Sequence, residues 1–385
     1  MDLTYTDEER DFRARLREWL AKALPELPAR PSPDDWPGRR AYDLGWQRRL
    51  YEAGYAGLHW PVDAGGRGAT PTQHLIFLEE TERAGAPYVG ANFVGLLHAG
   101  PTIAAEGTAA QRARWLPPVL RGEEVWCQGF SEPDAGSDLA SLRTRAVRDG
   151  DDYVITGSKI WTSHAEVADW CELLVRTDPE APKHRGISWL AMPMDAPGVT
   201  VRPLRTLAGS TEFAEVFLDE VRVPVADRVG AENDGWRVTM VTLSFERGTA
   251  FVGEVVACRR TLGELARTAK ANGRWDDPVL RRRLGRLHGE FGALWRLTQW
   301  NVSEAERSPG GVPGVGGSVF KLAYSHARQE LYDVAAEVLG AASLSLEEEW
   351  TLDRLSSLSY TIAAGTSQIQ RNIVAERILG LPKGR

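Results

Sequence analysis

The chain has 385 residues, 43% of them hydrophobic and 26% charged, and its formal net charge is −7. This near-average composition excludes a disordered or fibrous protein, and the length allows two or three domains. The acidic balance argues against general binding to nucleic acid, because that binding depends on cationic side chains at the phosphates.

The first residues, MDLTYTDEERDF, are acidic where a secretory signal carries a basic segment and an apolar run. No apolar run approaches the roughly 20 residues of a membrane-spanning helix. We therefore expect a cytoplasmic protein without a membrane span. The cysteines form no C-x-x-C pair and the histidines form no H-E-x-x-H motif, so we expect neither a disulfide framework nor a metal site.

Residues 1–122 are expected to form an α-helical domain. Thr6 is a candidate N-cap, and Phe12, Leu16 and Leu20 follow it at helical spacing. Further helical patterns cover residues 39–54, 71–85, 90–106 and 109–120.

Residues 123–229 are expected to form an antiparallel β-domain, either a sheet or a barrel. Short runs such as DDYVITGSKIWTS and FAEVFLDEVRVPV are rich in Val, Ile, Trp and Phe, and Gly, Pro and Asp punctuate them. Alternation with period two in such runs is typical of strands.

Residues 230–385 return to the helical period, which predicts a C-terminal helical domain. The helical segments lie near 234–271, 276–307, 317–342 and 346–358, and a last one begins near Ser367. The glycine-rich segment SPGGVPGVGGS (308–318) is expected to be a flexible connection. No strand precedes it and no Gly-Lys-Ser/Thr follows, so it is not interpreted as a phosphate loop.

The segment QGFSEPDAGSDL (128–139) places small and polar residues in a turn at the entry to the β-domain. Gly136 can expose backbone amides, and Ser131 and Ser137 offer hydroxyls, so the turn could bind an anion or the edge of a heterocycle. A simple polar turn between two domains is the alternative.

In GSKIWTSHAEVADW (157–170), Trp161 is followed by Thr162 and Ser163. An aromatic ring beside small hydroxyls could face a flat ligand, and a core tryptophan is the alternative.

The helical stretch LSFERGTAFVGEVVAC has an apolar stripe next to a face of small residues with one carboxylate, Glu246. The stripe is Val238, Val241, Phe245, Val252 and Val255, and the small face is Thr239, Thr242, Ala250, Gly253 and Ala257. Desolvation in such a groove would raise the pKa of Glu246 and suit it to act as a base. The alternative is an exposed glutamate on a closely packed helix pair.

Near the C-terminus, Gly365-Thr366-Ser367 precedes a helix. Its N-terminus could hold an anionic group, or Thr366 or Ser367 could be an ordinary N-cap.

These segments occur in an order that resembles the flavin-dependent acyl-CoA dehydrogenase family over nearly the whole chain. The likeness is carried by WPVDAGGRG (60–68), GFSEPDAGSDL, AEVFLDEVRVPVADRVG (214–230) and GTSQIQRNIVAERILG. It implies an N-terminal α-helical domain (1–122), a middle antiparallel β-domain (123–229) and a C-terminal four-helix bundle (230–385).

The resemblance implies bound FAD. Ser131 would bond the flavin ring, Ser137 the pyrophosphate and Ser163 the ring edge, with Trp161 packed beside the isoalloxazine. The full set of implied cofactor-binding positions is Gln128, Phe130, Ser131, Gly136, Ser137, Trp161, Ser163, Arg274, Glu337, Ala341, Thr366 and Gln368.

Many members of the family carry the catalytic glutamate just before the Gly-Thr of the C-terminal signature, where this chain has Ala364. A smaller group, isovaleryl-type and actinobacterial steroid side-chain enzymes, carries it on a helix, at the position of Glu246. The resemblance therefore implies Glu246 as the base, with Arg247 in support.

Two segments depart from the family pattern. EVLGAAS (337–343) replaces Q-x-x-G-G-x-G, which reaches the FAD of a neighbouring subunit, and GRWDDP (273–278) stands near the place of R-x-x-F-G. A homotetramer or dimer, or a heterotetramer completed by a related chain, are the assemblies that the resemblance implies.

The implied reaction is α,β-dehydrogenation of an acyl-CoA, with a branched or ring-bearing acyl group as one possibility. Electrons would pass to an electron-transfer flavoprotein. Three alternatives stay open: a carrier-protein-bound acyl substrate, a partner subunit of a heteromeric dehydrogenase, and flavin oxygenase chemistry.

Overall fold

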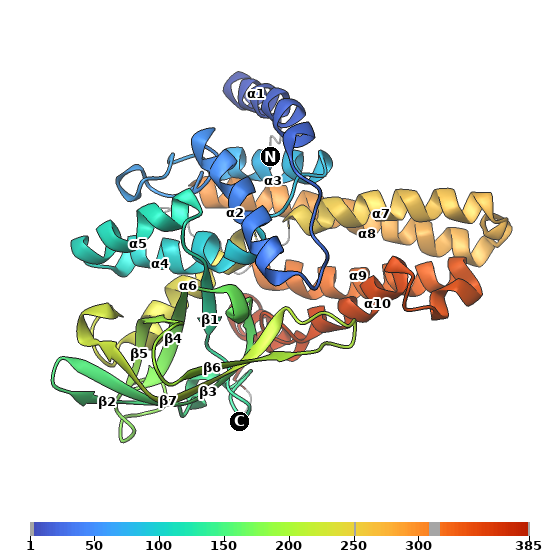
Figure 1. Ribbon diagram of the computed structural model, residues 1–385. Coiled ribbons are helices and arrows are strands. Elements are labelled where there is room, and N and C mark those ends of the chain that lie inside the picture. The colour runs from blue at the N-terminus through green and yellow to red at the C-terminus, as the bar shows by residue number, and fades with distance from the viewer. Residues whose placement is uncertain (1–3, 250–251, 308–315, 384–385) are drawn as a thin grey trace.

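The N-terminal part of the protein is a group of helices, as expected (Figure 1). The computed structural model describes residues 4–249, 252–307 and 316–383, except for the side chains of residues 246–249. The helices are α1 (Asp7–Ala23), α2 (Trp36–Glu52), α3 (Pro71–Arg83), α4 (Gly100–Glu106) and α5 (Ala109–Arg121). Thr6, Thr70 and Thr108 begin α1, α3 and α5 with capping boxes, which satisfy amide groups that a helix start leaves unpaired.

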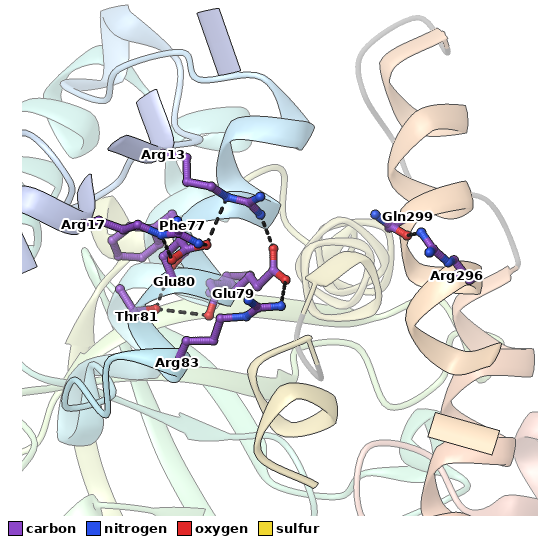
Figure 2. A network of polar contacts seen from close by, with 10 residues as sticks. Arg13, Arg17, Phe77, Glu79, Glu80, Thr81, Arg83, Arg296 and Gln299 are labelled. Atoms are coloured by element: carbon purple, nitrogen blue, oxygen red, sulfur yellow. Dashed lines mark hydrogen bonds and ion pairs between the residues drawn. The ribbon is translucent and has the colours of Figure 1, made fainter. Parts of the chain in front are cut away.

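An ion-pair network fastens α1 to α3 (Figure 2). Arg17 donates through Nε and Nη2 to the two carboxylate oxygens of Glu80, at 2.6 and 2.9 Å, and Arg13 pairs with Glu79 and Glu80. Both glutamates are buried on α3. Buried carboxylates require such partners, so the arginines of α1 specify where this helix docks.

The middle of the chain forms one sheet from eight strands of the described residues. They are β1 (Trp126–Gly129), β2 (Arg145–Asp149), β3 (Asp152–Ser163), β4 (Trp170–Arg176), β5 (Ile187–Pro193), β6 (Val199–Leu204), β7 (Phe213–Pro224) and β8 (Arg228–Val229). The order is β6-β7-β3-β2-β4-β5-β8, with β1 paired to β4. Most pairs are antiparallel, as expected, whereas β1 lies parallel to β4 and β2 touches β4 in parallel at one position.

The C-terminal part returns to helices. They are α6 (Gly235–Thr249), α7 (Val252–Ala271), α8 (Pro278–Arg307), α9 (Gly316–Leu339), α10 (Glu349–Ser357) and α11 (Ser367–Ile373). In Figure 1, α7, α8 and α9 run alongside one another and away from the sheet. Leu265, Leu287, Phe291 and Leu331 are buried in the core of this bundle. Most of the predicted flexible connection 308–318 lies outside the described residues.

Helix α6 contacts both the sheet and helix α4. Val238 packs in one core cluster with Trp189 of β5, and Thr242 Oγ1 lies 2.9 Å from Thr102 Oγ1 of α4. Thr239 and Thr242 are buried, so the small face predicted for this helix does admit a close neighbour. Among the described residues, no helix is both long and apolar enough to cross a membrane.

Candidate active site

The loop after β1 is held against β3 by backbone and side-chain bonds. Ile160 N donates to Ser131 O at 3.0 Å. The fully buried Lys159 Nζ donates to Phe130 O at 3.2 Å and to Glu132 Oε1 at 2.8 Å. These contacts place the predicted loop residues Phe130 and Ser131 beside the strand that carries Trp161.

Glu132 is the centre of this anchor. Its carboxylate accepts from Lys159 and from the backbone amides of Arg143 and Thr144, at 2.6 and 2.8 Å. Burial acts to raise the pKa of Glu132, but the charge of Lys159 and these hydrogen bonds outweigh it and lower that pKa. Burial is also the main influence on Lys159, and it lowers the pKa of the ammonium group. The carboxylate is therefore held ionised as a fixed acceptor for the loop.

Trp161 is 58% exposed and has φ of 61°. A left-handed conformation in a bulky residue is strained, and it occurs where β3 and β7 shift register between Lys159 and Thr162. The indole makes an edge contact with Phe213 at 5.9 Å. The strain turns the ring outward, so Trp161 is not the core residue of the alternative interpretation. Ser163, at the end of β3, is half-buried.

The Gly136–Ser137 part of the predicted turn is exposed to solvent. A methyl group added at Gly136 would meet nothing within 4 Å, and Ser137 is exposed. Gln128, on β1, is half-buried; its Nε2 donates to Glu172 Oε1 at 2.7 Å and lies 3.3 Å from His98 Nδ1. The turn thus presents open backbone on one side and is anchored through β1 on the other.

The loop 364–366 is a second anchored turn. Ala364 has φ of 50°, Gln370 Nε2 donates to Ala364 O at 3.1 Å, and the buried Lys321 Nζ donates to Gly365 O at 2.6 Å. Thr366 Oγ1 accepts from Ile369 N at 3.1 Å, so Thr366 is the N-cap of α11. Gln368 is exposed on the first turn of that helix.

The predicted base and its neighbour have described backbone only. Glu246 and Arg247 lie on the last turns of α6, and their side chains are outside the described residues, as is Ala250.

Three predicted residues form a separate group. Arg274 lies in η8 (Arg274–Asp276), Glu337 on the last turn of α9, and Ala341 in η10 (Gly340–Leu344), all exposed. Asn272 Nδ2 donates to Val338 O at 2.9 Å and joins these ends of α7 and α9. In Figure 1 the ends of α7 and α9 that adjoin these residues point away from the sheet.

The side chains that hold the two loops in place were not among the predicted site residues. Lys159, Lys321 and Gln370 touch the two loops directly, yet none was a candidate. The position of Lys159 in a strand with period-two alternation was an available signal, because an inward-facing lysine needs a buried acceptor.

Comparison with family models and known proteins agrees with this layout. The chain matches the N-terminal domain of acyl-CoA dehydrogenases over residues 6–123, the middle domain over 127–221 and the C-terminal domain over 233–379. It is 40% identical to acyl-CoA dehydrogenase IpdE1 of Mycobacterium tuberculosis, over 97% of this chain and 98% of that protein. It is 36% identical to acyl-CoA dehydrogenase FadE26 of the same organism, over 100% and 99%.

Solved structures show the same fold over the whole chain. The Tcur3481-Tcur3483 steroid ACAD superposes with a TM-score of 0.86 at 33% identity, covering 100% of both chains. The ChsE4-ChsE5 complex from Mycobacterium tuberculosis superposes with a TM-score of 0.81 at 33% identity, also covering 100% of both chains. With domain matches, long relatives and structures in agreement, the chain belongs to the acyl-CoA dehydrogenase family and is an oxidoreductase.

Proposed function

We propose that this protein catalyses the FAD-dependent α,β-dehydrogenation of an acyl-CoA thioester to the trans-2-enoyl-CoA. The observation that carries the proposal is the outward, strained Trp161 beside the anchored Ser131 loop. Strained residues that the surroundings hold in place concentrate at functional sites. A branched or ring-bearing acyl group fits the small side chains of Ala363 and Ala364.

The described residues fit a flavin. The indole of Trp161 offers a large exposed ring, and the Gly136–Ser137 turn has open backbone. Thr162 Oγ1 is buried and has no hydrogen-bond partner in the described part of the chain. Such a buried hydroxyl is costly unless a further group bonds to it. No three of the described His, Cys, Asp or Glu side chains are grouped to share a metal ion.

The residues that would hold FAD come from two regions of this chain. Ser131, Ser137, Trp161 and Ser163 would contact it from the sheet, and Thr366 and Gln368 from the start of α11. Gln128, Phe130 and Gly136 would shape the loop around it. When bound, FAD supplies the acceptor for the β-hydrogen as hydride.

Residues of this chain would carry out the removal of the α-proton. Glu246 would remove the α-proton, and Arg247 would support that carboxylate. The thioester carbonyl must accept hydrogen bonds for this proton to become acidic, and the amide of Glu246 or of the 364 loop would donate one. Each preorganised donor contributes about 3 kcal/mol by analogy with oxyanion holes. Lys321 and Gln370 fix the 364 loop for that task.

Replacing the base tests this assignment. We expect Glu246→Gln to lower kcat by about 10²- to 10⁴-fold, the range for general base catalysis, while FAD stays bound. Steady-state rates and the FAD content of the purified protein are the measurements. Glu264→Gln, another carboxylate on the adjoining helix α7, is the matched control and should keep its rate. Full activity in Glu246→Gln would remove Glu246 from the mechanism.

The assembly is a separate proposal. Arg274, Glu337 and Ala341 lie at the ends of helices that point away from the sheet in Figure 1, which fits residues that reach the FAD of a neighbouring chain. The neighbour could be a second copy, in a dimer or homotetramer, or a related chain, in a heterotetramer. Two of the similar solved structures are each named for a pair of chains. An electron-transfer flavoprotein is the proposed acceptor, and a carrier-protein thioester is the alternative substrate.

A further inference from the structure

Helix α6, which carries the candidate base, lies against α4 and is fastened to it at two points (Figure 1). At the start of α6, Arg237 donates through Nη1 and Nη2 to the two carboxylate oxygens of Glu106, both at 2.7 Å. Further along, Thr242 Oγ1 lies 2.9 Å from Thr102 Oγ1. The helices run antiparallel past these contacts, because Arg237 meets the later residue of α4 and Thr242 the earlier one. Two such points set both the rotation and the axial position of α6 against α4.

The pair of threonine hydroxyls stands in an otherwise apolar contact. Thr102 and Thr242 are buried, and Ile103 and Val238, next to them on the two helices, belong to one apolar core cluster. Thr102 Oγ1 also lies 2.7 Å from His98 O, and Thr242 Oγ1 lies 3.2 Å from Val238 O. A hydroxyl has one hydrogen, so one threonine donates across the interface and the other donates to a backbone carbonyl.

This pair contributes alignment of the helices more than stability. Two valines have the shape of two threonines, and replacing both partners of a buried hydrogen bond by apolar groups of the same shape is nearly neutral or stabilising. A satisfied buried polar pair, however, specifies one arrangement of the core around it. A shift of α6 along α4 would break the bond between the hydroxyls, whereas a pair of valines would tolerate the shift.

The candidate base lies one turn beyond the pair. Glu246 follows Thr242 by four residues within α6, so it lies on the same face of the helix, about 6 Å further along the axis. The described backbone is helical throughout this turn. The position of Thr242 therefore fixes the position of the backbone at Glu246.

We propose that Thr102 and Thr242 are positioning residues for removal of the α-proton. Their hydroxyl pair holds the turn of α6 that presents Glu246 to the substrate. This inference rests on the proposed function and adds two residues that act through the base without touching the thioester.

The double variant Thr102→Val/Thr242→Val tests the inference. Octanoyl-CoA, isovaleryl-CoA and cholan-24-oyl-CoA are compared on the wild type, and the one that bleaches its flavin fastest is used. We expect the limiting rate of anaerobic bleaching to fall about 10- to 100-fold, because a misplacement of about 1 Å can cost that much. The dissociation constant of the thioester should change less than about twofold. The unfolding temperature should stay close to that of the wild type.

Two controls separate positioning from packing. Thr102→Ser/Thr242→Ser keeps both hydroxyls and should keep most of the rate. Thr239→Val removes another buried hydroxyl of α6, which donates to Gly235 O at 2.7 Å within its own helix, and should bleach at the wild-type rate. A wild-type rate in the double valine variant would overturn the inference, and so would an equal loss in either control. A loss of rate that comes with a large fall in unfolding temperature would leave the pair a structural role only.

If no acyl-CoA bleaches the wild-type flavin, the dehydrogenase proposal fails instead. Exchange of the C2 hydrogens of the same thioesters with D2O, followed by proton NMR, then decides the inference by itself, since it requires only removal of the α-proton. Exchange that is about tenfold slower in the double valine variant would support the inference. Equal exchange in the two proteins, or none in the wild type, would refute it.

Discussion

At the scale of single residues, Lys159 shows how one buried charge can organise a site. Its ammonium group bonds to Phe130 O and Glu132, and the next residue, Ile160, bonds to Ser131 O. A buried ion pair adds little net stability, but removing one partner leaves a buried charge alone. The pair therefore acts mainly to fix the loop, and the loop positions Ser131 relative to Trp161.

We predict that Lys159→Met destabilises the protein by about 3–5 kcal/mol, because Glu132 remains buried without its partner. Thermal unfolding of the protein without added FAD measures this loss. The FAD dissociation constant should also rise, since the loop loses its anchor.

The double variant Lys159→Met/Glu132→Gln separates the two effects. It removes the unpaired charge, so stability should partly return while FAD binding stays weak. Recovery of tight FAD binding in the double variant would show that the pair does not position the loop.

At the scale of elements, α3 carries two kinds of buried ionisable group. Its glutamates are matched by arginines of α1, whereas its histidine is not matched by a charge. His74 stacks against His59, with ring centroids 4.4 Å apart. Burial lowers the pKa of His59 to about 4, and burial together with His59 lowers the pKa of His74 well below its usual value. With these lowered pKa values, both rings stay neutral in the folded protein at neutral pH.

This pair predicts a loss of stability in mild acid. Between about pH 6.5 and pH 4 the unfolded chain binds protons at these histidines and the folded chain does not, so the free energy of unfolding falls as pH falls. His59 alone accounts for roughly 3 kcal/mol of this change. Urea unfolding at several pH values measures it, and His74→Gln should make the curve shallower by the share that His74 contributes, leaving the share of His59. An unchanged curve in that variant would contradict the assignment.

The elements differ in how far the sequence could predict them. Long amphipathic helices such as α8 and α9 follow from their apolar spacing, and their ends fall within a few residues of expectation. The segment 90–106, expected as one helix, is instead η3 (Gly90–Asn92), a π-helix η4 (Gly95–Ala99) and α4. The spacing of apolar residues does not distinguish one continuous α-helix from this series of shorter helices. Which of them forms depends on packing against α6 and β1.

At the scale of the whole molecule, the order of the three regions and their helical or β character could be predicted from the sequence. The long-range contacts that connect distant segments could not. The change of period from helical to two and back marks the sheet region. The parallel pairing of β1 with β4 joins segments some forty residues apart, and no local pattern encodes it. The domain boundaries at 122 and 229 stay predictions.

The candidate site also has one part that motifs predict and another part that depends on tertiary contacts. Trp161, Ser131 and the 364 loop were recognisable from motifs. The outward turn of Trp161 depends on a register shift between β3 and β7, and the hydroxyl pair of Thr102 and Thr242 depends on the meeting of α4 and α6. Both arise from tertiary contacts, so residue patterns along the chain could not reveal them.

The proposed activity requires that the protein hold FAD and that an acyl thioester reduce it. The decisive experiment is an anaerobic titration of the purified protein with acyl-CoAs, followed by the visible absorbance of the flavin. We predict a yellow protein whose flavin bleaches on addition of a thioester, supplied with its partner chain if one completes the site. A flavin that stays oxidised with every acyl-CoA, in the presence of any partner chain, would contradict the proposed dehydrogenation.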